Sequence, residues 1–107
     1  MATQIDRQAV YAYLAAIPPQ RVVTYGQIAE FLGNKNLCRA VGNILHQNPD
    51  ADRYPCYKVV NAQGRLSPSY AFGGLEGQKA RLETDGIPVI GNRVDLNIYQ
   101  ADPLEFL

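Results

Sequence analysis

Apolar residues recur at helical spacing near the start of the chain, which predicts a first helix with one buried face. Thr3 is a candidate N-cap for this helix, and Asp6 places an acid in the first turn, where the helix dipole favours negative charge. The Pro18-Pro19 pair ends the helix, because proline has no amide hydrogen to donate to the helical ladder. The apolar positions are Val10, Leu14 and Ile17.

Two shorter helices follow, joined by a small polar turn. Thr24 and Gln27 have the spacing of a capping box, and Gly33 ends the helix that they begin. Asn36 is a candidate cap for the next helix, which Asn48-Pro49 ends. Its apolar stripe consists of Leu37, Val41, Ile44 and Leu45. Such a pair is typical of a helix-turn-helix, although any two amphipathic helices with a short turn give the same pattern.

The second half of the chain is predicted to hold a small hairpin, a polar helix and one late strand. The hairpin covers residues 58–66, with Gly64 at a positive φ in its turn. Residues 75–85 form the polar helix, which Gly86 ends. Residues 94–98 alternate between apolar and polar side chains, which is typical of a strand with one buried face.

The composition indicates one soluble globular domain over residues 1–107, with 47% hydrophobic and 19% charged residues. No apolar run approaches the ~20 residues that span a bilayer, so we expect no membrane contact. Two cysteines are too few for a disulfide scaffold, which favours reduced thiols in the cytoplasm. His46 is the only histidine and no cluster has metal-ligand spacing, so we expect neither a metal nor a cofactor.

The charges are balanced in number but not in position. Residues 1–66 carry seven basic and four acidic side chains, whereas residues 67–107 carry three basic and six acidic ones. This asymmetry allows one face to meet phosphates, although ordinary surface scatter produces a bias of the same size.

One stretch, Tyr54 to Val60, carries the candidate chemistry. Pro55 has a fixed φ and pushes the residue before it into an extended conformation, so the backbone that presents Cys56 is stiff. Lys58 adds positive charge nearby, which favours thiolate over thiol. A buried cysteine that acts as a small hydrophobe fits the same stretch.

Seven segments with these features occur in a fixed order. They are Ile17-Pro18, residues 22–29, Arg39 to Gly42, Asn48-Pro49, Pro55 to Val60, Gly64 and Gly73-Gly74. In this order and spacing, over residues 5–86, they resemble the DNA-binding domain of O6-alkylguanine-DNA alkyltransferases and of alkyltransferase-like proteins. The resemblance implies a mainly α fold with a small β wing, a winged helix-turn-helix.

The resemblance also implies roles for single residues. Arg39, at the start of the recognition helix, matches the arginine that enters the duplex from the minor groove and replaces an everted base. Tyr25 matches the tyrosine that turns the nucleotide and hydrogen-bonds the guanine ring. Asn48 matches an asparagine that braces the turn before the active site. The Val59 carbonyl and the amide near Phe72 correspond to backbone groups that bind the guanine edge and O6.

Cys56 matches the alkyl-acceptor thiol, which takes the alkyl group once and irreversibly as a thioether. Active members of the family usually read Pro-Cys-His-Arg, with a glutamate behind the histidine, whereas this chain has Tyr57, Lys58 and, at the glutamate position, Asp85. Because tyrosine is a poor base at neutral pH, we expect slower transfer, with Tyr57 acting through a water or Lys58 stabilising the thiolate. Alkyltransferase-like proteins usually have tryptophan at the cysteine position.

Three functions therefore fit the sequence. The first is a single-turnover transferase that repairs O6-alkylguanine in duplex DNA through Cys56. The second is a non-enzymatic sensor that binds the same lesion and recruits nucleotide excision repair proteins. The third is a plain helix-turn-helix regulator with an inert cysteine. In each case we expect a monomer, associated with the nucleoid in a prokaryote or located in the nucleus of a eukaryote. Cys38 is expected to fill the core, and His46 to lie on the outer side or at the end of the recognition helix.

Overall fold

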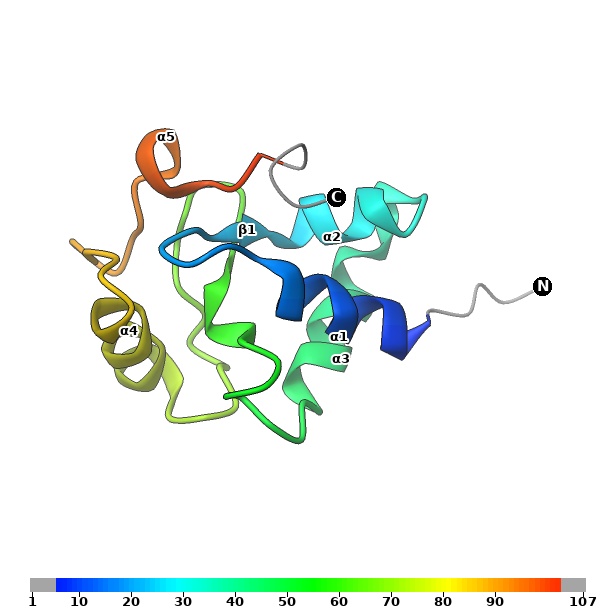
Figure 1. The fold of residues 1–107 in the computed structure, drawn as a ribbon, viewed down its shortest axis with the longest axis horizontal. Coiled ribbons are helices and arrows are strands. Elements are labelled where there is room, and N and C mark those ends of the chain that lie inside the picture. The colour runs from blue at the N-terminus through cyan, green and yellow to red at the C-terminus, as the bar shows by residue number, and fades with distance from the viewer. Residues whose placement is uncertain (1–5, 103–107) are drawn as a thin grey trace.

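The computed structural model describes residues 6–102, which are mostly helical around a small two-stranded sheet (Figure 1). The elements are α1 (Arg7–Ala16), β1 (Val23–Thr24), α2 (Tyr25–Phe31), α3 (Cys38–His46), β2 (Val59–Val60), α4 (Gly74–Thr84) and α5 (Leu96–Tyr99), with 3₁₀ turns at Lys35–Leu37 and Cys56–Lys58. None of the described helices is long and apolar enough to cross a membrane.

Helix α1 begins later than its sequence pattern predicts. Its N-cap is Asp6, whose carboxylate accepts from the amides of Gln8 and Ala9 at 2.9 and 3.3 Å. The prediction that Asp6 lies inside the first turn is therefore wrong, and Thr3, the predicted cap, lies outside the described residues. The end of the helix just before the Pro18-Pro19 pair is confirmed.

The capping box that begins α2 is confirmed. The Thr24 hydroxyl accepts from the Gln27 amide at 3.1 Å, and the Gln27 side chain accepts from the Thr24 amide at 2.9 Å. The predicted Asn36 cap of α3 is wrong, because Asn34 caps the intervening 3₁₀ turn and accepts from the Asn36 amide at 2.9 Å. Helix α3 then starts at Cys38 without a side-chain cap.

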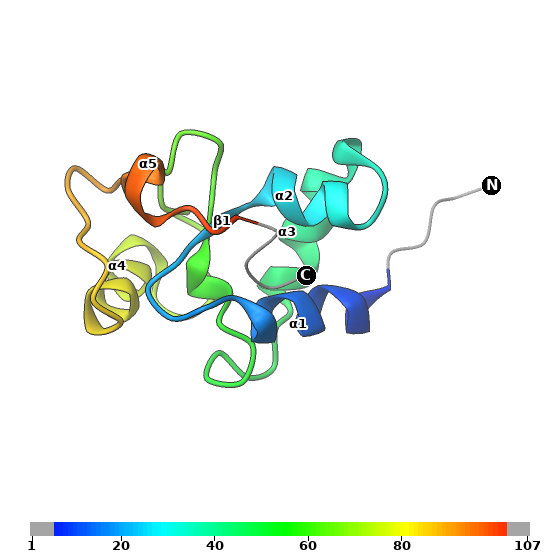
Figure 2. The same cartoon turned by 45° about the horizontal axis from the view of Figure 1, so that its top comes forward.

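The sheet pairs two distant segments. Strands β1 and β2 are parallel, with Val23 opposite Val59. The predicted hairpin is therefore wrong in its pairing, although its turn exists: Gly64 has a φ of +82°. Strand β2 is fully buried and pairs with the equally buried β1. Arg65, which belongs to the other arm of the predicted hairpin, instead forms an isolated antiparallel β-bridge with Arg93. The turn lies beside α5 in both ribbon views (Figures 1 and 2).

The predicted late strand at residues 94–98 is also wrong, because the short helix α5 begins at Leu96 within it. The Asp95 carboxylate caps this helix and accepts from the Asn97 amide at 3.0 Å. A capping side chain of this kind gives the backbone a local alternative to a strand.

Two apolar clusters cover the two faces of the sheet. Val23 and Val59 belong to the first cluster, which α1, α2 and α3 complete. Val22 and Val60 belong to the second, which residues of α4 and the later segments complete. Side chains along an extended segment alternate between faces, so β2 contributes to both clusters, as do Val23 of β1 and the residue before it, Val22. Cys56, just before β2, packs into the first cluster, and this position brings its sulfur toward α3.

Candidate functional site

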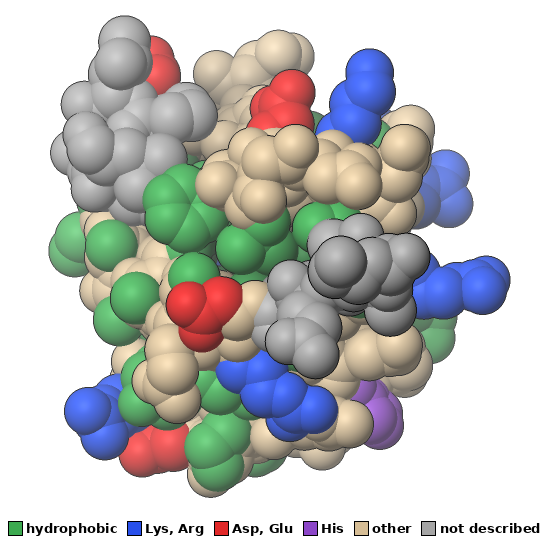
Figure 3. Space-filling view, turned by 90° about the vertical axis from the view of Figure 1, so that its right-hand side faces the viewer, with side chains coloured by type: hydrophobic (Ala, Val, Ile, Leu, Met, Phe, Trp, Pro, Cys, Tyr) green, Lys and Arg blue, Asp and Glu red, His purple; other side chains and the backbone are tan. Residues whose placement is uncertain are grey.

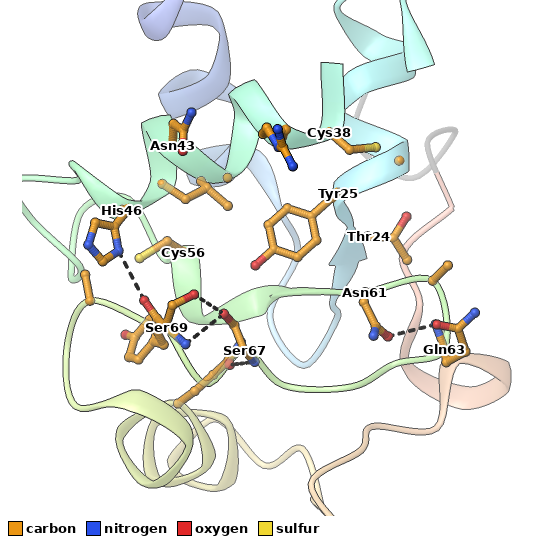
Figure 4. Close-up of a pocket in the computed structure, with 18 residues that line it drawn as sticks. Thr24, Tyr25, Cys38, Asn43, His46, Cys56, Asn61, Gln63, Ser67 and Ser69 are labelled. Atoms are coloured by element: carbon orange, nitrogen blue, oxygen red, sulfur yellow. Dashed lines mark hydrogen bonds between the residues drawn. The ribbon is translucent and has the colours of Figure 1, made fainter. Parts of the chain in front are cut away.

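A cavity of about 650 Å³ lies between α3, the start of α2 and the segment from residue 56 to residue 71 (Figure 4). It brings together Cys56, Tyr25 and Arg39, which are far apart in the sequence. Other lining residues are Cys38, His46, Ser67, Ser69, Tyr70 and Gln78. Within residues 6–102, no three His, Cys, Asp or Glu side chains gather in a way that suits a metal ion.

Cys56 is held in place by the turn that precedes it. Its amide donates to the Tyr54 carbonyl at 2.7 Å, and Pro55 stands between the two residues. The buried Asn48 side chain donates to the same carbonyl at 2.7 Å and accepts from the Asp50 amide at 3.0 Å. These bonds fix the backbone around Cys56, whose residue surface is only 4% exposed.

The surroundings of Cys56 favour the neutral thiol. Burial raises the pKa of the Cys56 thiol, because a thiolate loses hydration inside the protein. The nearby Asn48 side chain, the backbone and the Tyr70 hydroxyl oppose this shift, as does the positive charge of Arg81, but burial is the largest effect. At neutral pH the resting sulfur therefore carries its proton.

Lys58 and Asp85 do not line the cavity. The Lys58 ammonium lies 3.4 Å from the Asp85 carboxylate and donates to the Pro18 carbonyl at 3.1 Å. Asp85 also accepts from the Gln20 amide at 3.3 Å, so the pair joins the end of α4 to the segment before β1. The expectation that Lys58 stabilises the thiolate stays a prediction, and the positive charge that lowers the pKa of Cys56 is that of Arg81.

Tyr57 also lies outside the cavity lining. Its ring packs against the second apolar cluster, and the Arg81 guanidinium carbon lies 5.0 Å from its centroid. Arg81 in turn donates to the Asp52 carboxylate at 2.8 Å. The structure thus separates Tyr57 from the space in front of the sulfur and gives its ring a packing role.

Tyr25 and Arg39 do reach the cavity. Tyr25 is the first residue of α2, and Figure 4 shows its ring projecting into the space between α3 and residues 61–69, with the hydroxyl turned toward Cys56 and Ser67. Burial raises the pKa of Tyr25, partly offset by a hydrogen bond with Ser67, so this hydroxyl stays a donor. Arg39, the second residue of α3, is exposed at the cavity.

Neither Val59 nor Phe72, which are predicted to supply backbone contacts to the base, lines the cavity. The Val59 carbonyl already accepts from the Gln78 side chain at 3.0 Å, and Val59 is 1% exposed. Phe72 is exposed and packs its ring 5.7 Å from that of Tyr70, whereas Tyr70 and Ala71 line the cavity in its place.

The chain is similar to known proteins over most of its length. The model of the family described as "6-O-methylguanine DNA methyltransferase, DNA binding domain" matches residues 6–87. The chain belongs to this family. The resemblance that the sequence motifs indicate is thereby confirmed.

Individual relatives agree with this assignment. The chain is 38% identical over 91 residues to a bifunctional methyltransferase/endonuclease of Picrophilus torridus, covering 85% of this chain and 30% of that protein. It is 35% identical over 96 residues to a DNA base-flipping protein of Vibrio parahaemolyticus, covering 88% and 93%. The crystal structure of Schizosaccharomyces pombe Atl1 in complex with damaged DNA containing O6-carboxymethylguanine superposes with a TM-score of 0.81 at 28% identity, over 91% and 94% of the two chains.

Three cavity residues of this family member are not assigned to the site by the sequence pattern. Gln78 lies on α4, is 1% exposed, donates to the Tyr57 and Val59 carbonyls and accepts from the Ser67 amide at 2.8 Å. Its position in a polar helix predicts an exposed side chain. The second is Tyr70, which lies in the irregular loop before α4.

His46 is the third. It is exposed at the end of α3, as expected, but its Nδ1 also lies 3.1 Å from the Ser69 carbonyl. Because a carbonyl only accepts, Nδ1 carries the hydrogen of this bond. Cys38 departs from expectation, since it is half-buried against the first cluster yet lines the cavity, and its thiol donates to the Lys35 carbonyl at 3.3 Å.

Proposed function

We propose that this protein binds O6-alkylguanine in duplex DNA, receives the everted base in the cavity and transfers the alkyl group to Cys56. The observation that carries this proposal is the meeting of Cys56 and Tyr25 in one cavity with Arg39 exposed at it. The cavity volume of about 650 Å³ lies within the range of small-molecule sites, so a purine with a short alkyl group fits by size. The relatives named for base flipping and solved with damaged DNA support a DNA partner.

In this proposal α2 and α3 act as a helix-turn-helix, α3 enters the minor groove, and the turn at residues 61–64 serves as the wing. Arg39 fills the space of the everted base, which offsets part of the cost of unstacking. Figure 3 shows Lys and Arg side chains at the right-hand edge of one face, above the purple imidazole of His46, and others at its centre and lower left. The protein acts as a monomer with one domain.

The chemistry is a direct displacement. The Cys56 thiol gives its proton to water, and the thiolate attacks the alkyl carbon of the lesion. The sulfur–carbon bond forms while the bond from that carbon to O6 breaks, and the released guanine takes a proton from water. The thioether does not turn over, so each molecule acts once. Because burial raises the pKa of Cys56, only a small fraction of the protein is ready to react at neutral pH, and transfer is slow.

One observation favours a second function, a damage sensor that recruits nucleotide excision repair without transferring the alkyl group. The residues at the usual positions of the base and its carboxylate, Tyr57 and Asp85, do not line the cavity. A site that recognises the base but does not activate the sulfur binds the lesion and leaves it intact.

The intact mass of the protein separates these functions. The protein is incubated with a duplex that contains one O6-methylguanine, and Cys56→Ala serves as the control. A gain of one methyl group on the wild type and none on the variant establishes the transferase. No gain, together with tighter binding of both proteins to the methylated than to the unmodified duplex, establishes the sensor. Equal affinity for both duplexes excludes both, and selection from random duplexes then tests a sequence-specific regulator.

A further inference from the structure

The hydroxyl of Tyr70 is unusual within the part of the chain that the structure describes. It is the one buried side-chain nitrogen or oxygen there that has no hydrogen-bond partner. Buried polar groups are nearly always paired, so an unpaired one calls for a partner that appears during function. Tyr70 lines the cavity that also contains Cys56.

The group that Tyr70 acts on is the Cys56 sulfur. The Tyr70 hydroxyl acts to lower the pKa of Cys56, whereas burial and, as a smaller cause, the nearby Cys56 raise the pKa of Tyr70. Tyr70 therefore keeps its proton and acts only as a donor. A neutral thiol is a weak acceptor and leaves the hydroxyl without a full hydrogen bond, whereas a thiolate is a strong one.

The loop holds this hydroxyl in position. The Tyr70 amide donates to the Ser67 carbonyl at 3.2 Å, and the Gly74 amide donates to the Tyr70 carbonyl at 2.9 Å, so both backbone groups are fixed. The ring packs against Phe72 and the first apolar cluster. A donor that the loop already holds in the same cavity as the sulfur needs little reorganisation when the thiolate forms.

Tyr25 and Arg39 also line the cavity, but several other donors and cations near it have partners elsewhere. Lys58 binds Asp85, and the Nδ1 hydrogen of His46 points to the Ser69 carbonyl. Arg81 acts on the sulfur through its charge alone, while its guanidinium binds Asp52.

We propose that Tyr70 is a catalytic residue whose hydroxyl donates a hydrogen bond to the Cys56 thiolate and so makes the nucleophile available, a role that the sequence motifs assign to Tyr57 and Lys58. The thiol proton leaves to water, and Tyr70 retains its own. The reactive thiolate is part of the transferase proposed above, but its stabilisation by Tyr70 is a property of the protein without DNA and is measured separately.

The test is the pH dependence of Cys56 alkylation by iodoacetamide in wild type and Tyr70→Phe, followed by peptide mass spectrometry so that Cys38 is counted apart. Loss of the charge-assisted bond is expected to move the Cys56 profile upward by about one pH unit, which is a roughly tenfold slower reaction near neutrality. Tyr11→Phe is the matched control, because it removes a hydroxyl from a buried tyrosine on α1 that does not line the cavity. Its profile is expected to match the wild type.

Identical profiles for all three proteins overturn the role of Tyr70. Because the hydroxyl has no hydrogen-bond partner, Tyr70→Phe is expected to keep or raise the thermal unfolding midpoint. A shift in the pH profile of Cys56 alkylation at an unchanged midpoint would therefore exclude a merely structural effect. Methyl transfer is scored independently. If the profile shifts in Tyr70→Phe but the wild type transfers no methyl group, the role of Tyr70 stands and the transferase proposal is refuted. If wild type and Tyr70→Phe transfer the methyl group at equal rates, the transferase proposal stands and the role of Tyr70 is refuted.

Discussion

Gln78 joins three segments of the site, and its replacement by leucine tests whether this single side chain holds them. The substitution keeps the approximate volume and the helical propensity of the position but removes every hydrogen bond that the amide makes. The bonds lost are those to the Tyr57 and Val59 carbonyls, both at 3.0 Å, and to the Ser67 amide at 2.8 Å.

The expected loss follows from these three bonds. Each net hydrogen bond contributes about 1 kcal/mol, and a buried amide left without a partner costs a further ~1–3 kcal/mol. The leucine side chain recovers part of this through burial, so we expect Gln78→Leu to lower the free energy of unfolding by about 3 kcal/mol. A domain of this size has about 5–15 kcal/mol in total, so the change is large.

Urea unfolding followed by circular dichroism measures this loss, and an unchanged slope with denaturant shows that the folded state remains compact. Glu83→Leu is the matched control, because Glu83 is exposed on the same helix. It is expected to change the free energy of unfolding by less than about 0.5 kcal/mol. If Gln78→Leu loses no more than Glu83→Leu, the three bonds do not stabilise the site and the reasoning fails.

Three further outcomes are expected. Gly64→Ala is expected to lower the free energy of unfolding, measured by thermal unfolding, by more than about 2 kcal/mol, because φ is +82° there and the added Cβ would clash with a backbone carbonyl. Gly91→Ala, at a φ of +60° with open space around it, is expected to lower it by about 1 kcal/mol, so equal losses would contradict the clash. Lys58→Met breaks the ion pair with Asp85 and is expected to lower the thermal unfolding midpoint but to leave the rate of Cys56 alkylation unchanged. Slower alkylation in this variant would show that Lys58 acts on the thiol. Burial raises the pKa of Cys56 above the ordinary value of 9.0, so its neutral thiol stabilises the fold at neutral pH and this contribution disappears as pH rises above that value. Urea titrations are therefore expected to show that the free energy of unfolding falls more steeply at alkaline pH in wild type than in Cys56→Ala.

Several parts of the fold follow from neighbouring residues alone. The Thr24–Gln27 capping box, the end of α1 before Pro18 and the positive φ of Gly64 are all found as predicted. Each depends on bonds or steric limits within a few residues, so no distant segment is needed to specify it. The order of motifs around Cys56 likewise carries the family assignment, which the match over residues 6–87 confirms.

Other parts depend on which segments meet in space. Strand β2 pairs with β1, which is equally short and buried, and nothing local distinguishes that pairing from a hairpin. Residues 94–98 alternate like a strand, but the Asp95 cap bonds its own backbone and starts α5.

The site itself divides in the same way. Cys56, Tyr25 and Arg39 are recognised in the sequence because their motifs are local, and the fold brings them to one cavity. Which groups surround the sulfur was decided by tertiary structure: α4 carries the Arg81 charge toward it, and an irregular loop brings the Tyr70 hydroxyl. Charge and hydrogen bonding act over a few ångströms of space, and adjacency in the chain, as for Lys58, does not determine which groups lie within that distance.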